Sequence, residues 1–192
     1  MTDALRAQEE AKYRAVWTTV PDYRCYSPGL NAAPEAFSAC GMRKGESLLD
    51  LGCGTGRAGA WFHKQGMNVT LLDLCDKAPE CQLPFVVACL WEPSELPPFD
   101  WIFCCDVLEH LPPEKVGPAL DVIAGLMEKG GYLQVFTAPD AGWGGIGDLH
   151  LTVRDASWWA AMIEQRMEII RRVDAPRPRA AWVVRPKRKG TA

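Results

Sequence analysis

Three glycines at alternate positions, directly after a short apolar run, constrain the fold of this chain more than any other feature. The run is Leu48–Leu51, and Gly52, Gly54 and Gly56 follow it. An apolar run that ends in glycines predicts a buried strand and a turn. Glycine lets the backbone approach a ligand closely and adopt positive φ. Residues after Gly56 are expected to form a helix whose N-terminal amides suit a carboxylate or a phosphate, so a nucleotide-like ligand is predicted here.

The spacing of the glycines separates this site from two common nucleotide sites. Dinucleotide-binding proteins use G-x-G-x-x-G, whereas here the third glycine comes one residue early and Arg57 takes its place. The phosphate-binding string G-x-x-x-x-G-K-[ST] does not occur in the sequence. The next predicted strand, residues 68–73, ends in Asp73, a carboxylate that can accept hydrogen bonds from both hydroxyls of a ribose.

The D-x-G-x-G-x-G run, followed by Asp73, resembles the class I S-adenosylmethionine (SAM)-dependent methyltransferases. Residues 99–111 resemble the fourth-strand motif of small members of that family, typified by ubiquinone-biosynthesis enzymes. Residues 129–135 resemble the start of its fifth strand. Because several motifs occur in the right order, the resemblance is more specific than one glycine motif. It implies a methyltransferase that uses SAM as its cofactor.

Strands that alternate with helices predict a parallel sheet covered on both faces. The resemblance implies a doubly wound, Rossmann-like α/β fold with a seven-stranded, mostly parallel sheet and an antiparallel C-terminal hairpin strand. A length of 192 residues fits one domain over residues 1–192. Residues 1–44 are expected to hold an N-terminal helix (2–17, capped by Thr2) and a cover segment. We expect Gly117 and Pro118 to break the helix after strand four, and residues 185–192 to form a basic tail.

The resemblance also implies roles for particular residues. The predicted cofactor-binding residues are Asp50, Gly52, Cys53, Gly54, Gly56, Asp73, Leu74, Leu90, Trp91 and Asp106. The glycines admit the methionine part, and Asp50 holds its ammonium group directly or through water. Asp73 takes the ribose, and Asp106 lies near the methionine end. Trp91 either stacks on the adenine or packs in the core. The family usually has an acid where this chain has Cys89.

A second group of polar residues follows the fourth predicted strand. Asp106, Glu109 and His110 form D-x-x-E-H, which is similar to the E-x-x-E-H metal site of some methyltransferases that act on catechol-like or RNA 2′-hydroxyls. A metal there lowers the pKa of the hydroxyl. However, Leu-Glu-His-Leu also occurs in small methyltransferases that need no metal, in which the Glu packs and the His borders the substrate. We therefore predict no metal ligands and take His110, His150 and Glu109 as the catalytic candidates.

The nature of the methyl acceptor is less constrained. The string N-P-P-Y, typical of amine methylation on nucleobases, is not present after strand four, and Cys105 lacks the preceding proline of carbon-5 pyrimidine methyltransferases. With little chain left for a substrate domain, we expect a small-molecule acceptor methylated on oxygen or nitrogen. The glycine-rich residues 138–147 are the candidate lid. The alternatives are a nucleic-acid methyltransferase that uses the basic tail, and a SAM-binding module without catalysis.

Charge and cysteine usage limit the class of protein. The net charge of −3 divides into +7 over residues 165–192 and −10 over the rest. The tail can contact a nucleic-acid backbone, or it is simply a solvated terminus. Eight cysteines without a C-x-x-C pair favour a reducing cytosol over disulfides or zinc. No apolar run of eighteen residues and no apolar signal core occur, so we predict a cytoplasmic protein without a membrane partner.

Overall fold

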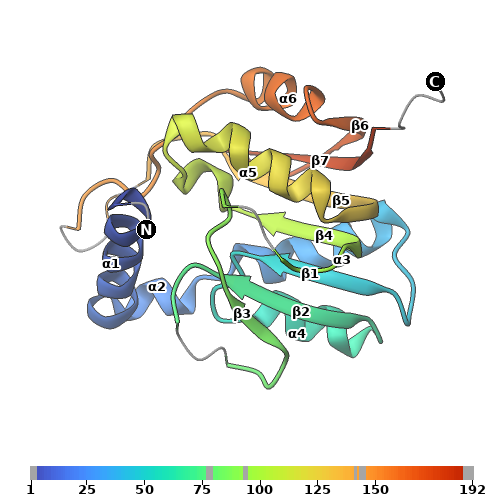
Figure 1. The fold of residues 1–192 in the computed structure, drawn as a ribbon, viewed down its shortest axis with the longest axis horizontal. Helices are drawn as coiled ribbons and strands as arrows, with labels where there is room; N and C mark the ends of the chain where they lie inside the picture. Colours follow the sequence, from blue (N-terminus) through green and yellow to red (C-terminus); the bar gives the residue numbers. More distant parts are fainter. Residues whose placement is uncertain (1–3, 77–79, 93–94, 141, 143–145, 188–192) are drawn as a thin grey trace.

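A computed structural model describes residues 4–76, 80–92, 95–140, 142 and 146–187 of the chain. These residues form one seven-stranded sheet with helices on both faces (Figure 1). The strands are β1 (Ser47–Leu51), β2 (Asn68–Asp73), β3 (Phe85–Val87), β4 (Phe99–Cys105), β5 (Met127–Phe136), β6 (Met167–Val173) and β7 (Arg179–Pro186). The helices are α1 (Ala4–Thr19), α2 (Pro21–Cys25), α3 (Pro28–Cys40), α4 (Arg57–Lys64), the 3-10 turn η1 (Leu108–His110), α5 (Pro113–Gly125) and α6 (Ala156–Glu164).

The order of the strands across the sheet is β3-β2-β1-β4-β5-β7-β6. The pairs β1–β2, β1–β4, β2–β3 and β4–β5 are parallel, whereas β7 runs antiparallel to both β5 and β6. The sheet therefore confirms the prediction of a doubly wound, mostly parallel α/β fold with an antiparallel C-terminal strand. The strand order reverses beside β1, so the carboxyl ends of β1 and β4 border the crevice where ligands bind in such sheets.

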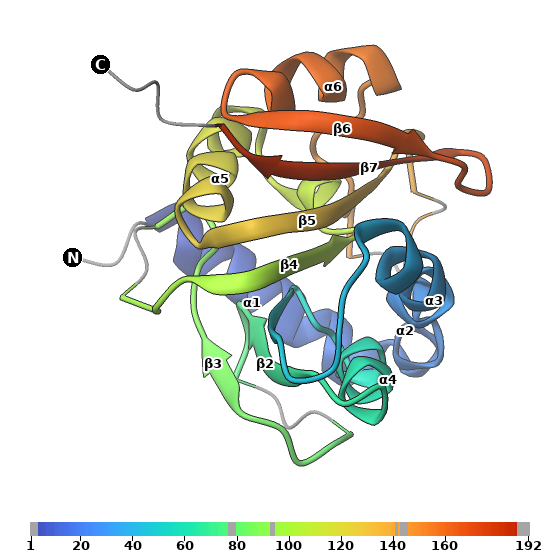
Figure 2. The same ribbon diagram turned by 90° about the vertical axis from the view of Figure 1, so that its right-hand side faces the viewer.

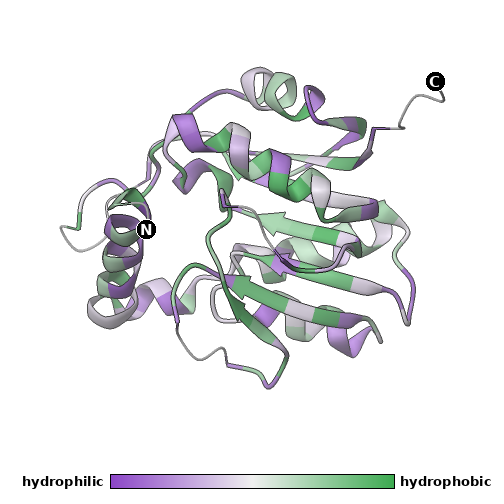
Figure 3. Ribbon diagram, in the orientation of Figure 1, coloured by the Kyte–Doolittle hydropathy of each residue, from purple (hydrophilic) through white to green (hydrophobic). Residues whose placement is uncertain are grey.

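Helices cover both faces of the sheet (Figure 2), and a hydrophobic cluster lies on each face. Successive residues of β1 point to opposite faces: Leu49 packs in the cluster with α5 and α6, and Leu48 in the cluster with α3 and α4. Because the central strands are covered on both faces, they are almost continuously hydrophobic, as Figure 3 shows. This core holds the loops at the carboxyl ends of the strands in fixed positions.

Three helices form the N-terminal part of the chain, where the sequence suggested one helix and a cover segment. The first helix, α1, stands across the carboxyl ends of the central strands (Figure 1) and confirms the expected helix, although Thr2 lies outside the described residues. Helix α3 was not expected. Pro28 begins it at a position that tolerates proline, and Gly41 ends it in a left-handed conformation with φ of 71°. Its small residues Ala33 and Ala36 are buried against the sheet.

Two further expectations near the other end need correction. Helix α5 runs without interruption through Gly117 and Pro118, so the predicted break does not occur. Strand β7 extends to Pro186, so the predicted basic tail begins inside the sheet; Arg185 forms two hydrogen bonds with Glu168, at 2.8 and 2.6 Å. Residues 188–192 of that tail lie outside the described part of the chain. Among the helices that the structure describes, none has both the length and the apolarity to span a bilayer.

Candidate functional site

A cavity of about 330 Å³ opens at the carboxyl ends of β1, β2 and β4. Helix α1 and the segment before α3 roof it, which agrees with the expectation that the N-terminal residues cover the site. The predicted site residues that line the cavity are Asp50, Gly52, Cys53, Gly54, Asp73, Leu74, Leu90, Trp91, Asp106, His110 and His150. Gly56 and Glu109 are not among the lining residues. Gly56 instead precedes α4 as its N-cap, with φ of 78°.

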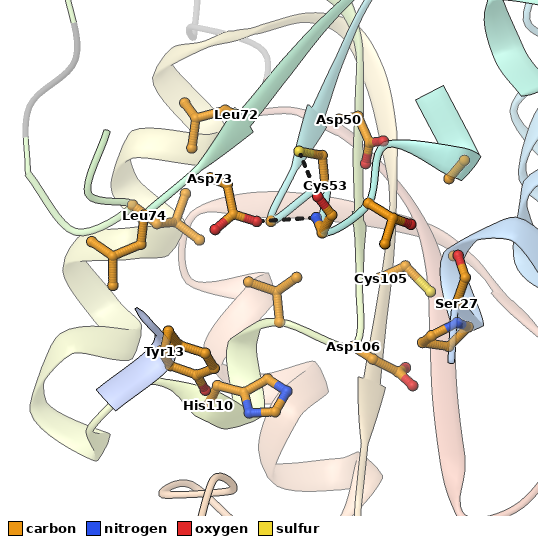
Figure 4. A pocket seen from close by; sticks show the side chains of 18 of the residues that line it. Tyr13, Ser27, Asp50, Cys53, Leu72, Asp73, Leu74, Cys105, Asp106 and His110 are labelled. Atoms are coloured by element: carbon orange, nitrogen blue, oxygen red, sulfur yellow. Dashed lines mark hydrogen bonds between the residues drawn. The ribbon is translucent and has the colours of Figure 1, made fainter. Parts of the chain in front are cut away.

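The glycine turn is held to the end of β2. The backbone N–H of Gly54 donates to Oδ2 of Asp73 at 3.0 Å, as Figure 4 shows, and the N–H of Cys53 donates to the carbonyl of Leu72 at 3.0 Å. A Cβ on Gly52, where φ is +64°, would lie 2.5 Å from Cγ2 of Val107. Glycine is therefore required there, both for the backbone conformation and for the space.

Asp50 is a buried carboxylate on the floor of the cavity. Only 2% of this residue is exposed, and its Oδ2 has no hydrogen-bond partner within the described part of the protein. Burial raises the pKa of Asp50 to about 7. A buried acceptor of this kind fits a cationic group such as an ammonium, which would favour the ionised carboxylate. Together with the bare backbone at Gly52, it fits the amino-acid part of the cofactor that the sequence implies.

Leu90 and Trp91 form an apolar wall beside the end of β2. Both residues are 8% exposed, line the cavity and also belong to the hydrophobic cluster that covers α5. Trp91 therefore belongs to the core and also borders the cavity, and its stacking on an adenine stays a prediction. Leu74 lines the same cavity. This wall is suited to a flat, apolar ring.

Asp106 leaves β4 in a strained conformation and forms an ion pair. Its φ is 53°, which is rare for a residue other than glycine. Its Oδ2 accepts from Nε of Arg179 at 2.7 Å, and its Oδ1 accepts from Nε2 of Gln134 at 3.0 Å. Arg179 also donates to the hydroxyl of Tyr26 and lies 4.8 Å from the ring centre of Phe136. The carboxylate of Asp106 therefore connects the end of β4 to β5 and β7. Through Arg179 it is also connected to the cover segment.

His110 and His150 lie against each other in the wall of the cavity. Their ring centres are 4.8 Å apart. Nδ1 of His110 is 3.0 Å from the carbonyl of Leu149, and Nδ1 of His150 is 2.8 Å from the carbonyl of Ala138. A carbonyl accepts only, so each Nδ1 carries a proton, and in a neutral imidazole with this tautomer Nε2 has the lone pair. Burial, followed by the effect of His150, lowers the pKa of His110 to about 4.

Glu109 has a structural contact behind the histidines. It is completely buried, and its Oε1 accepts from the backbone N–H of Phe136 at 3.0 Å. Burial and the nearby Asp106 raise the pKa of Glu109 well above its usual value, which favours the neutral acid. Ligand atoms of Glu109, His110 and His150 lie within 4.8 Å of one another. Asp106, the first acid of the D-x-x-E-H string, is instead paired with Arg179.

Several residues that line the cavity are too distant in sequence from the predicted site residues for motif spacing to reveal them. Tyr13 and Trp17 come from the buried side of α1, and the ring of Tyr13 meets that of His110 edge-on at 5.8 Å (Figure 4). Arg179 comes from the first residue of β7. The only signal in the sequence was the aromatic face of the first helix, because nothing near Arg179 marks it as a site residue.

The candidate lid is described only in part, because residues 141 and 143–145 of it lie outside the described chain. Within it, Asp140 accepts from the backbone N–H groups of Leu149 and Gly142, at 2.6 and 2.9 Å. The same carboxylate accepts from the backbone N–H of His150 at 3.3 Å. Asp140 thus holds the segment that carries His150 beside the cavity.

Comparison with known proteins finds a matching family profile, a relative in sequence and solved structures with the same fold. The profile of the methyltransferase domain family matches residues 26–177. The ubiquinone biosynthesis O-methyltransferase of Xylella fastidiosa is 33% identical over 108 residues, which cover 48% of this chain and 42% of that protein. The matched region therefore spans less than half of that relative.

Two solved structures show the same fold at low identity. The 1,6-didemethyltoxoflavin-N1-methyltransferase of Burkholderia thailandensis, solved with 1,6-didemethyltoxoflavin and S-adenosylhomocysteine, has a TM-score of 0.66 at 20% identity. That comparison covers 95% of this chain and 87% of that one. The N-methyltransferase NodS of Bradyrhizobium japonicum, solved with S-adenosylhomocysteine, has a TM-score of 0.65 at 16% identity, over 92% of this chain and 96% of that one.

Proposed function

We propose that this chain, which belongs to the methyltransferase domain family, transfers the methyl group of SAM to an oxygen or nitrogen atom of a small molecule. One observation carries the proposal. A single cavity contains the glycine turn with Asp73 on one side and the lone pairs of His110 and His150 on the other. A cofactor site and a proton-accepting site therefore share one space.

The residues that would hold the cofactor follow from the geometry of the cavity. The bare backbone at Gly52 and the buried carboxylate of Asp50 suit the amino-acid part, and Asp73 suits the ribose. Leu90 and Trp91 suit the adenine. When bound, SAM supplies an activated methyl group on its sulfonium. The relatives solved with S-adenosylhomocysteine support this choice of cofactor.

The protein then has to align the acceptor and remove its proton. Alignment of two reactants can supply roughly 7–11 kcal/mol of the barrier. A base within hydrogen-bond reach assists when the acceptor is a hydroxyl. Because a pKa of about 4 makes His110 a weak proton acceptor near neutral pH, we assign the general base to His150 and the orientation of the acceptor to His110. Glu109, neutral and hydrogen-bonded to the backbone N–H of Phe136, holds the turn η1 against the end of β5.

The aromatic roof favours a flat acceptor of small size. Tyr13, Trp17 and Tyr23 close the cavity from the N-terminal side, and Phe136 lies beside His150 with ring centres 5.1 Å apart. The toxoflavin enzyme is named for a small-molecule acceptor and the Xylella relative for ubiquinone biosynthesis, which supports this class.

The described part of the basic tail is already engaged within the fold. Arg185 is paired with Glu168, and Lys187 donates to the carbonyl of Gln165. We therefore assign these residues to the edge of the sheet and not to a nucleic-acid backbone. A cytoplasmic location remains a prediction from the sequence.

Two measurements test the proposal. Isothermal titration should detect binding of SAM and S-adenosylhomocysteine, and NADH should give no heat. Transfer of a radioactive methyl group should then be screened over phenols, catechols, heteroaromatic amines and, as a comparison, RNA and DNA. Absence of SAM binding, or methylation of nucleic acid in preference to every small molecule, would contradict the proposal.

A further inference from the structure

Glu9 is a charged residue with almost no solvent exposure, although it belongs to the helix that roofs the cavity. Only 4% of the residue is exposed, and it lines the cavity. Nζ of Lys12 lies 2.5 Å from its Oε2. A buried carboxylate is costly unless it is paired, and a carboxylate has lone pairs for several donors. Helix α1 therefore brings a further carboxylate to the cavity, besides those at the ends of the strands.

Contacts on either side of Glu9 show which part of the cavity it faces. Arg6, one turn before Glu9, pairs with Glu92 at 2.6 Å, and Glu92 directly follows Trp91. Tyr13, one turn after Glu9, meets the ring of His110. A helix rises about 5.4 Å per turn, so Glu9 lies about one turn from each of these contacts. It therefore stands between the apolar wall of Leu90 and Trp91, which we assign to the adenine, and His110.

The end of β2 provides a third reference point. The thiol of Cys75 donates to the carbonyl of Glu10 at 3.6 Å, so this turn of α1 stands over the residues that follow Asp73. The two oxygens of Asp73 already accept from the backbone N–H groups of Gly54 and Cys75, at 3.0 and 3.3 Å. The region between the adenine wall and the ribose carboxylate thus has Glu9 as its roof.

We propose that Glu9 determines cofactor specificity, because its carboxylate accepts a hydrogen bond from an N–H or O–H donor of the adenosine half of SAM. Adenosine offers such donors at the exocyclic amine and at the two ribose hydroxyls. The acid comes from the roof helix, while position 89, after β3, is a cysteine. This inference rests on the proposed function, since it requires SAM in this cavity.

The first test measures affinity for S-adenosylhomocysteine by isothermal titration. Hydrogen bonds to charged groups contribute enough that Glu9→Gln should weaken binding between about 10-fold and 100-fold. Glu10→Gln is the matched control: Glu10 is the next residue of the same helix and pairs with Arg14 at 2.5 Å on the exposed side. This control should stay within about threefold of the unmodified protein.

The second test uses the selectivity of binding, which a purely structural role of Glu9 would not change. Analogues of S-adenosylhomocysteine with a dimethylated N6 amine, or without the ribose hydroxyls, should bind the unmodified protein more weakly than the parent compound. In Glu9→Gln the penalty for one of them should shrink about 10-fold, which identifies the donor. The analogue without ribose hydroxyls keeps the part of its penalty that arises from the lost contact with Asp73. Glu9→Asp, which keeps the charge, should retain part of the selectivity and also serves if Glu9→Gln does not fold.

The possible outcomes separate this inference from the proposed function. If the unmodified protein does not bind S-adenosylhomocysteine at all, the proposed function fails. If it binds and Glu9→Gln binds equally well, Glu9 has no role in recognition and the inference is wrong. The inference is also wrong if Glu9→Gln weakens the binding of the parent compound and of both analogues by the same factor. That result would show that Glu9 acts only through the packing of α1.

Discussion

Nε of Arg179 donates to Oδ2 of Asp106 across 2.7 Å, and this contact joins the first residue of β7 to the end of β4. The two side chains are only 12% and 8% exposed. A largely buried ion pair is costly to break, because the remaining partner stays charged in a poorly solvated place. The pair also fixes Tyr26 of the cover segment, since Arg179 donates to its hydroxyl. The edge of the cavity thus depends on one contact between distant parts of the sequence.

We expect Arg179→Met to lower the free energy of unfolding by about 3–5 kcal/mol, because it leaves Asp106 buried without its cation. Urea unfolding measures this change. Arg185→Met is the matched control on the same strand: its partner Glu168 is 45% exposed, and an exposed pair contributes about 1 kcal/mol or less. Equal losses for the two variants would show that the Asp106 pair has no special weight.

Gly52→Ala should impair cofactor binding and stability together. A left-handed conformation costs about 1–2 kcal/mol for a residue with a Cβ, and that Cβ would also lie 2.5 Å from Val107. We expect a loss of at least that size in urea unfolding, and at least a 10-fold weaker binding of S-adenosylhomocysteine.

Gly125→Ala is the control for this substitution. Gly125 ends α5, and no neighbouring atom lies within 4 Å of the position that a Cβ would take there. The change should therefore be neutral or stabilising by up to about 1 kcal/mol. A Gly52→Ala protein that binds and unfolds normally would contradict the assigned turn.

His150→Gln should lower kcat for a hydroxyl acceptor about 100-fold or more, because general bases typically contribute at least that factor. The affinity for S-adenosylhomocysteine should stay unchanged, since the proposal assigns this histidine to the acceptor and not to the cofactor. His63→Gln is the control, because His63 lies on α4 with Nδ1 3.4 Å from the carbonyl of Met67. As the proposed chemistry uses no metal, dialysis against a chelator should leave activity intact. Activity that returns only with an added divalent cation would favour a metal at His110, His150 and Glu109.

The low pKa of the partly buried His110 should make stability fall in mild acid. Its pKa is about 4 in the folded protein, against an ordinary value of 6.5. Between these values the unfolded chain binds the proton and the folded protein does not, so the free energy of unfolding decreases as the pH falls from 6.5 to 4. The shift corresponds to roughly 3 kcal/mol at most.

Asp50 acts in the opposite direction over a similar range, so a comparison between variants is needed. Its pKa of about 7 lies above the ordinary 3.8, and its contribution to stability therefore decreases as the pH rises from 3.8 to 7. In His110→Asn only the histidine contribution is removed. Urea unfolding at about pH 6.5, 5.5 and 4.5 should show this variant gaining stability relative to the unmodified protein as the pH falls. A difference that stays constant over these pH values would show that His110 does not titrate as described.

Local patterns in the sequence were sufficient for most of the sheet. Residues 167–173 were expected as a strand and form β6 with the same bounds. Parallel strands end at one edge of a sheet, so residues that follow β1, β2 and β4 were expected to meet, and Asp50, Asp73 and His110 line one cavity. These expectations depend only on periodicity, on glycine and on the ordered motifs.

The parts that were missed depend on tertiary contacts. Helix α3 contains Pro34 and begins at Pro28, so its residues favoured a turn; burial of Ala33 and Ala36 against the sheet stabilises the helix instead. The partner of Asp106 is 73 residues away, and no spacing rule connects Arg179 to the site. Pro118 was expected to break α5, yet Val116, Ala119 and Leu120 on either side of it are buried in the core.

The position of α1 has a practical consequence for work with this protein. Its residues Glu9, Tyr13 and Trp17 line the cavity, whereas β7 ends at Pro186 on the far side of the sheet (Figure 1). Affinity tags and immobilisation handles therefore belong after the last residue of the chain. A bulky fusion placed before α1 would load the helix that roofs the cavity, and a screen with such a protein would underestimate its activity.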